Sequence, residues 1–199
     1  MKRIDEQLFL YFNQSGSEQW DLFWTLLTDK FLALPLFGLI LLFLWKKYNF
    51  RTVVILGVFM VGMVGFTDVV ATVVKNIVER PRPCSVNSPI SEQVRVVSDG
   101  VFGSLTTKNA EKCEKFSFFS AHAAVSFALA LFFGLLLTKT FRYALTLLVI
   151  WGVFVSISRI YLGFHYPSDI LVGSIVGALI GWLTYKGVIA LQNRFKYSL

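Results

Sequence analysis

The sequence predicts an all-α integral membrane protein: a single membrane domain over residues 1–199, folded as a helical bundle of about five transmembrane helices. Hydrophobic residues make up 55% of the chain, which is more than a soluble domain of this size carries. Five stretches also approach the roughly 20 apolar residues that cross a bilayer. We expect spans at about 24–45, 52–75, 118–137, 141–162 and 170–191.

The N-terminal segment 1–23 is expected to lie at the membrane surface as an amphipathic interfacial helix. Ile4, Leu8 and Tyr11 fall on one side of a short helix, whereas charged residues occupy the rest of it. The acidic pair Asp5 and Glu6 follows the basic pair at the start, and no long apolar run comes next, so we do not expect a secretory signal peptide.

The charged residues predict the orientation of the spans. The connections between five spans alternate between the two sides of the membrane. One side has eight basic residues and no acidic one; it includes the turns near 46–51 and 138–142 and the C-terminal tail. The positive-inside rule places that side in the cytoplasm, and the N-terminus and the long loop 76–117 on the exoplasmic side. Because the positive charge follows the turns, we expect membrane lipids and not nucleic acid as partners.

The loop 76–117 holds both cysteines of the chain, Cys84 and Cys113. In an oxidising compartment these two could close the loop with a disulfide. Two free thiols remain the alternative.

The first group of polar residues near a membrane surface lies at the end of the second span. Lys75 is followed by Pro81 and Arg82. The proline ends the helix, so Arg82 can turn back and join Lys75 on one anion. The alternative is a pair of cations that extend to lipid headgroups.

The second group opens the third span. Ser120 is a favourable N-cap, and the free backbone N–H groups of the turn that follows form an anion site. His122 lies in that same turn. A simple helix cap beside a structural histidine is the alternative.

The third group lies between the last two spans. Arg159 offers a planar fork suited to two phosphate oxygens. His165 precedes Asp169 by four residues, with Pro167 between them, so the Asp169 carboxylate can hold the second imidazole nitrogen while it also caps the last helix.

Together the three groups predict a phosphate pocket. The only two histidines, His122 and His165, are brought to the same side as three cations, so one can attack phosphorus while the other protonates the leaving group. A zinc site would need a third ligand, and the cations would repel the metal. We therefore expect no metal and no other cofactor.

These residues resemble the three signature segments of the type 2 phosphatidic acid phosphatase family, also called lipid phosphate phosphatases, in its bacterial membrane branch. The first segment, Lys75 to Pro83, and the third, Ser158 to Asp169, match the family spacing. The second reads FSAH at 119–122 where the family usually has PSGH, so Ala121 must allow the phosphate to approach despite its methyl group.

The resemblance implies His165 as the nucleophile of a phosphohistidine intermediate, with Asp169 orienting it. It implies His122 as the acid that protonates the leaving oxygen and then activates water. It further implies that four residues hold the phosphoryl oxygens: Lys75, Arg82, Ser120 and Arg159.

The expected function is that of a metal-independent lipid phosphate or diphosphate phosphatase on the outer face of a bacterial cytoplasmic membrane. Undecaprenyl diphosphate or phosphatidylglycerol phosphate is expected first as substrate, and lipid A phosphate next. A lipid phosphotransferase that uses the same phosphohistidine is the alternative enzyme. A non-catalytic protein that binds or transports lipid headgroups is the other alternative.

Two further patterns concern the spans themselves. Asp68 shares a helical face with Thr72 and Lys75; an acid at this depth is either functional or, as we expect, a structural partner for a neighbouring span. Glycines repeat every four residues at 173, 177 and 181, which predicts close helix packing within the bundle.

Overall fold

The computed structural model describes residues 2–97, 113 and 115–195. The parts of the predicted loop at 98–112 and 114, and the residues after 195, lie outside this description. The regular elements are α1 (Lys2–Gln14), α2 (Glu18–Thr28), α3 (Lys30–Lys47), α4 (Phe50–Val78), the short 3₁₀ helix η1 (Ser91–Gln93), α5 (Ala121–Leu137), α6 (Ala144–Tyr161) and α7 (Pro167–Phe195).

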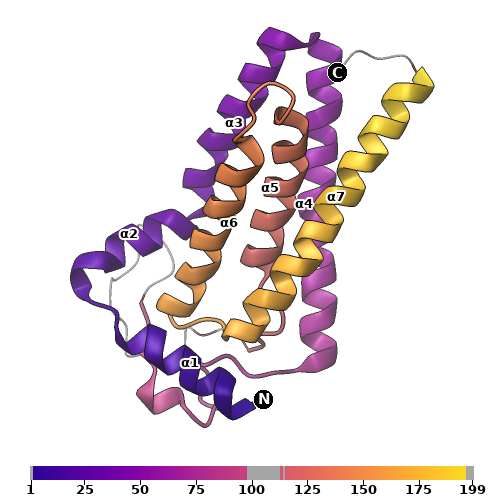
Figure 1. Cartoon of the computed structure of the whole chain (residues 1–199). Helices are drawn as coiled ribbons and strands as arrows, with labels where there is room; N and C mark the ends of the chain where they lie inside the picture. Colours follow the sequence, from indigo (N-terminus) through magenta and orange to yellow (C-terminus); the bar gives the residue numbers. More distant parts are fainter. Residues whose placement is uncertain (1, 98–112, 114, 196–199) are drawn as a thin grey trace.

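The helices α3 to α7 form an elongated bundle, and α1 and α2 lie at one of its ends (Figure 1). The end of α4, the start of α5 and the α6–α7 turn reach that same end, whereas the α3–α4 and α5–α6 turns lie at the opposite end. All three polar sequence groups therefore lie at the α1 end of the bundle, as the alternation of the spans predicts.

The described helices confirm the prediction of a helical membrane bundle. α4, α6 and α7 are long and apolar enough to cross a bilayer. α5 is apolar but has only 17 residues, and it packs against α4, α6 and α7. Most of its side chains are buried against these neighbours, so α5 forms the centre of the bundle. The count of five spans stays a prediction.

The first predicted span, 24–45, is wrong as a continuous helix. α2 ends at Thr28 and its C-cap residue Asp29 adopts an extended conformation. The helices on either side of the break are bent by 43°. An ionisable residue in the middle of an apolar run favours such an interruption, since a carboxylate is costly to place in hydrocarbon. Together α2 and α3 make one broken span or a re-entrant segment.

Small residues set the contact between α5 and α7. A Cβ atom added at Gly177 would lie 1.9 Å from the Ala124 carbonyl oxygen, and one at Gly181 would lie 2.2 Å from that of Ala128. At Gly173 the corresponding distance, to the Ser120 carbonyl oxygen, is 2.6 Å. Only glycine permits this approach, so the predicted packing within the bundle is confirmed.

The helix α1 has two different faces. Ile4, Leu8 and Tyr11 are exposed at 62%, 46% and 73%, as an interfacial helix requires. The opposite face is buried: Phe9 and Asn13 are fully enclosed. The Asn13 amide donates hydrogen bonds to the carbonyls of residues 95, 160 and 161 at 2.8–3.3 Å. The N-terminal segment is thus bound into the bundle as well as amphipathic.

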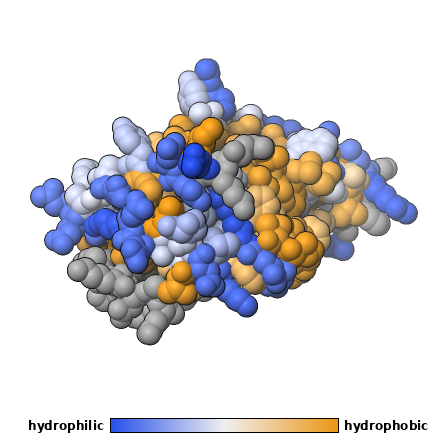
Figure 2. Space-filling model, turned by 90° about the horizontal axis from the view of Figure 1, so that it is seen from below, coloured by the Kyte–Doolittle hydropathy of each residue, from blue (hydrophilic) through white to orange (hydrophobic). Residues whose placement is uncertain are grey.

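Seen from the α1 end of the bundle, hydrophilic side chains cover much of the surface and hydrophobic ones lie beside them (Figure 2).

Candidate active site

A cavity of about 630 Å³ opens at the α1 end of the bundle. Six of the residues predicted from the sequence line it, although they come from three separate motifs of the chain: Lys75, Arg82, Ala121, His122, Arg159 and His165. The structure thus brings both histidines and three cations to one space. Two predicted residues, Ser120 and Asp169, do not line the cavity and lie behind its wall.

The first motif leaves α4 through a left-handed residue. Glu79 ends the helix with φ 50°, and its N–H donates to the Lys75 carbonyl. The chain then runs through Pro81 to Arg82, which is 4% exposed and donates from Nε to the Phe116 carbonyl at 3.2 Å. Pro81 also pairs with Phe116 in an isolated bridge. These contacts fix the turn that returns Arg82 toward Lys75.

The second motif forms the start of α5. Ser120 is the N-cap, and its Oγ accepts a hydrogen bond from the Ala123 N–H at 3.4 Å. Its own N–H donates to the Asp169 carbonyl at 3.1 Å, so the first turns of α5 and α7 are joined. Ala121 and His122 follow at the cavity wall. The contribution of Ser120 in this structure is therefore to fix the helix end.

The third motif closes α6. Arg159 is 1% exposed and donates from one terminal nitrogen to Thr28 Oγ1 at 3.2 Å, with its guanidinium 4.8 Å from the Phe164 ring centre. The turn beyond it needs Gly163, because φ there is +93° and a Cβ atom would lie 2.8 Å from the Arg95 carbonyl oxygen. This turn delivers His165 to the cavity.

The His165 imidazole lies beside a fully buried carboxylate. Its Nδ1 is 3.7 Å from Asp169 Oδ2, which is longer than a hydrogen bond, and Nδ1 has no hydrogen-bond partner among the described residues. Asp169 Oδ2 accepts from the Tyr166 N–H at 3.0 Å, and Oδ1 accepts from Arg80 at 2.7 Å. Catalytic hydrogen bonds are commonly long in ligand-free enzymes.

The surroundings of His165 keep its imidazole neutral. Burial, and then the positive charges of Arg82, Arg159 and Lys75, hold the pKa of His165 well below its usual value. A neutral imidazole retains a lone pair on nitrogen, which a nucleophile requires. The same cations that suit a phosphate group therefore also leave His165 with an uncharged imidazole nitrogen that could act as a nucleophile.

The cavity continues from the cations along apolar walls of four helices. Its deeper part is lined by Ala33 of α3, Val64 of α4, Leu129 of α5 and Trp151 of α6. Asp68 and Thr72 also line it, on the same helix as Lys75. We expected Asp68 to be a buried partner of a neighbouring span. That expectation is wrong, because Asp68 is exposed on α4 and bonds to no other described residue.

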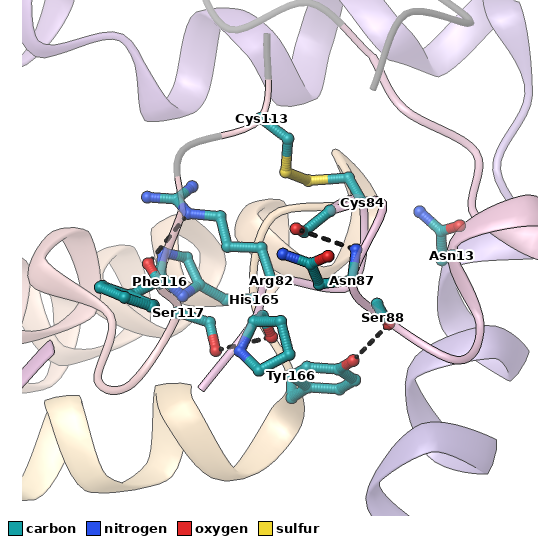
Figure 3. Close-up of a disulfide and its surroundings, with 12 residues drawn as sticks. Asn13, Arg82, Cys84, Asn87, Ser88, Cys113, Phe116, Ser117, His165 and Tyr166 are labelled. Atoms are coloured by element: carbon teal, nitrogen blue, oxygen red, sulfur yellow. Dashed lines mark hydrogen bonds between the residues drawn. A yellow bond between two sulfur atoms is a disulfide. The ribbon is translucent and has the colours of Figure 1, made fainter. Parts of the chain in front are cut away.

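A disulfide joins Cys84 to Cys113 beside the site, with Cα atoms 6.0 Å apart. Cys84 packs in one cluster with Tyr161, Leu162 and Phe164, and Figure 3 shows the disulfide near Arg82 and His165. The bond ties the segment after Arg82 to the segment before Phe116, whose carbonyl accepts from Arg82. The disulfide thus links two segments of the cavity rim covalently.

Sequence reasoning missed several residues that support the site. Thr28 comes from the segment taken as the first span, and Lys115 adds a further cation to the cavity. Arg80 lies inside the first motif and contacts both Asp169 and Asp5. The sequence did contain a signal for the face of α1 that packs on the bundle: Asp5, Phe9 and Asn13 are four residues apart and so share one helical face.

Comparison with known proteins identifies the family. The family model of the PAP2 superfamily matches residues 56–192, a range that contains all three motifs. The chain belongs to the PAP2 superfamily. This chain is 34% identical over 183 residues to the lipid A 4'-phosphatase of Bacteroides thetaiotaomicron. The alignment covers 92% of this chain and 76% of that protein. The chain is also 28% identical over 179 residues to phosphatidylglycerophosphatase B of Haemophilus influenzae, covering 75% of this chain and 72% of that one.

Two solved structures share the fold. The crystal structure of Aquifex aeolicus LpxE superposes with a TM-score of 0.64 at 21% identity, covering 90% of this chain and 93% of that one. The transmembrane PAP2-type phosphatidylglycerolphosphate phosphatase of Bacillus subtilis gives a TM-score of 0.63 at 20% identity, with coverages of 97% and 86%. The predicted family and its class, lipid phosphatases of bacterial membranes, are thereby confirmed for this PAP2 chain.

Proposed function

We propose that this PAP2 protein removes a phosphate group from a membrane lipid through a phosphohistidine on His165, with lipid A phosphate as its substrate class. The observation that carries the proposal is the single cavity in which His122, His165 and three buried or half-buried cations meet above apolar walls. A phosphate fits the cations, and acyl chains fit the walls below. The scheme uses side chains and backbone N–H groups of this chain and no metal.

In the first step, the lone pair on Nε2 of His165 attacks phosphorus, because Nδ1 faces Asp169. The bond between phosphorus and the lipid oxygen breaks, and protonated His122 gives its proton to that oxygen as the lipid leaves. Lys75, Arg82 and Arg159 neutralise the charge on the three phosphoryl oxygens in the transition state. The N–H groups at the start of α5 add a partial positive charge.

In the second step, His122 takes a proton from water, whose oxygen attacks the phosphorus of phosphohistidine. The P–N bond breaks, inorganic phosphate leaves, and His165 becomes neutral again. The low pKa of His165 makes its nitrogen a good leaving group for this step as well as an uncharged nucleophile in the first. His122 is protonated again, ready for the next lipid.

The choice of lipid A phosphate revises the order of substrates expected from the sequence. The similarity to the Bacteroides enzyme over most of both chains favours it. Asp68 adds a physical reason: it lies seven residues from Lys75 on α4, or about 10 Å along the helix axis, inside the same cavity. A sugar headgroup carries hydroxyl and amide donors at that distance from its phosphate, whereas a polyprenyl diphosphate has none.

We further propose that the cavity faces the exoplasm. The basic turns lie at the bundle end opposite the cavity, and the positive-inside rule assigns that end to the cytoplasm. The disulfide at the cavity rim supports the same orientation, because disulfides persist in oxidising compartments.

Phosphate release by purified, detergent-solubilised protein tests the function. Lipid A phosphate, phosphatidylglycerol phosphate, phosphatidic acid and undecaprenyl diphosphate are offered in matched micelles, with and without EDTA. We expect lipid A phosphate to be cleaved fastest, EDTA to have no effect, and His165→Ala or His122→Ala to abolish release. Full activity in either variant would remove the role assigned to that residue, and transfer of label to an added lipid in place of water would indicate a phosphotransferase.

A further inference from the structure

The catalytic end of the bundle contains an ion-pair chain that no part of the mechanism above uses. Arg80 donates from one terminal nitrogen to Asp169 Oδ1 at 2.7 Å and from the other to Asp5 Oδ2 at 2.6 Å. Its guanidinium also lies 3.8 Å from the centre of the Tyr166 ring. One arginine therefore bridges a carboxylate of α1 to the carboxylate beside the nucleophile.

Asp5 is held from the other side by the start of α7. Its Oδ1 accepts from the Ser168 N–H at 2.9 Å, and its Oδ2 accepts from the Ser168 hydroxyl at 2.5 Å. Ser168 Oγ is also 2.7 Å from Arg80. A carboxylate placed on the first N–H groups of a helix is favoured by the helix dipole. Asp5 thus caps the helix that carries Asp169.

The geometry leaves Asp169 little freedom. Its side chain is fully buried, whereas those of Arg80 and Asp5 are 20% and 12% exposed. Arg80 binds Oδ1 and the Tyr166 N–H binds Oδ2, so both oxygens are fixed and Oδ2 points toward His165 Nδ1. A buried carboxylate needs such partners, since an unpaired charge away from water is very costly.

Neither Asp5 nor Arg80 lines the cavity, so neither is placed to touch the substrate. We propose that Asp5 and Arg80 are positioning residues, which act through Asp169 to hold the His165 imidazole in the orientation that attacks phosphorus. This inference rests on the proposed function, because it assigns the partners of the same site. Asp5 lies outside the range matched by the family model, and Arg80 occupies the spacer between Lys75 and Arg82.

The chain offers a matched control in a second ion pair at the same end. Arg95 donates to Asp21 at 2.6 Å, with side chains 21% and 1% exposed, and its guanidinium lies over Tyr161. This pair ties α2 to the bundle much as Arg80 and Asp5 tie α1. It does not reach Asp169 or His165, so its loss reports only the general effect of breaking a half-buried ion pair.

The test compares Arg80→Gln, Arg80→Lys and Asp5→Asn with Arg95→Gln, using lipid A phosphate and phosphatidylglycerol phosphate in mixed micelles. We expect kcat to fall about 10- to 100-fold in Arg80→Gln, by analogy with the loss of outer partners that orient metal-bound histidines and carboxylates, while KM changes less than threefold. Arg80→Lys should recover part of kcat, and Asp5→Asn should lower it less than Arg80→Gln. Arg95→Gln should keep kcat within about threefold.

A second readout needs no turnover. With imidazole ¹⁵N labelling in a His122→Asn background, His165 is the only histidine and its tautomer is read by NMR. We expect Arg80→Gln and Asp5→Asn to shift the tautomer population, and Arg95→Gln to leave it unchanged. If Arg80→Gln fails to fold, Asp5→Asn and Arg80→Lys carry the test.

Two results would overturn the inference: wild-type kcat and tautomer in the Arg80 and Asp5 variants, or an equal loss of kcat in Arg95→Gln. If the wild-type protein cleaves neither lipid, the proposed function fails instead, and the NMR comparison still decides whether Arg80 positions His165.

Discussion

The substitution Gly177→Ala should separate α5 from α7 and weaken the fold. The added Cβ atom would lie 1.9 Å from the Ala124 carbonyl oxygen and 2.6 Å from its carbonyl carbon. Ordinary contact begins near 3.4 Å, so the helices must move apart by about 1.5 Å at this point. Backbone atoms cannot rotate away as a side chain can. We expect a loss of about 3 kcal/mol in the free energy of unfolding, the upper part of the range for overpacked cores.

Gly187→Ala is the matched control on the same helix. Nothing lies within 4 Å of a Cβ atom at that position, so the higher helix propensity of alanine should stabilise by up to about 1 kcal/mol. Unfolding of the protein in mixed micelles, followed by far-UV circular dichroism against denaturant, measures both variants. The reasoning is refuted if Gly177→Ala unfolds at the same denaturant concentration as Gly187→Ala. Activity should fall in Gly177→Ala as well, because α5 carries His122.

Three further outcomes follow from the site. Since burial and nearby cations lower the pKa of His165, its imidazole should remain neutral at pH 6, as measured by ¹⁵N NMR in a His122→Asn background. The free energy of unfolding should fall as pH drops below about 6.5, because the unfolded chain then binds a proton that the folded chain excludes. Titration of His165 at or above pH 6.5 would contradict this. Arg159→Lys should lower kcat/KM about 10- to 100-fold, because a point charge replaces a planar fork and loses the geometry of the Thr28 contact; kinetics equal to the wild type would contradict that assignment. Asp68→Ala should raise KM for lipid A phosphate about 10-fold, worth about 1.4 kcal/mol, but leave phosphatidic acid unchanged, and an equal effect on both lipids would remove the sugar contact.

The spacing of charged residues in the sequence predicted much of the site. Lys75 and Arg82 lie on either side of Pro81, and Arg159 precedes His165 by one tight turn, so span alternation was enough to assign all four to one end. The structure places them around one cavity. The local rules that predict a helix end at a proline or an N-cap at a serine need no knowledge of distant contacts.

Long-range contacts were beyond those rules. Asp5 is 163 residues from Ser168 and 75 from Arg80, and no periodicity relates them. The same holds for Arg159 and Thr28, 131 residues apart. The break at Asp29 also depended on tertiary structure, because an acid in an apolar run is compatible with either a bent span or an interfacial start.

The shape of the cavity bears on how turnover should be measured. Its cations lie at the bundle end and its apolar walls continue between helices, so under the proposed function a lipid substrate would stay partly dissolved in the membrane while its phosphate is cleaved. The concentration that governs the rate is then the mole fraction of substrate among the surrounding lipids or detergent, and not its amount per volume. Diluting substrate with inert detergent at constant bulk concentration should slow the enzyme. Water-soluble phosphate esters, which leave the apolar walls empty, should be poor substrates at any concentration.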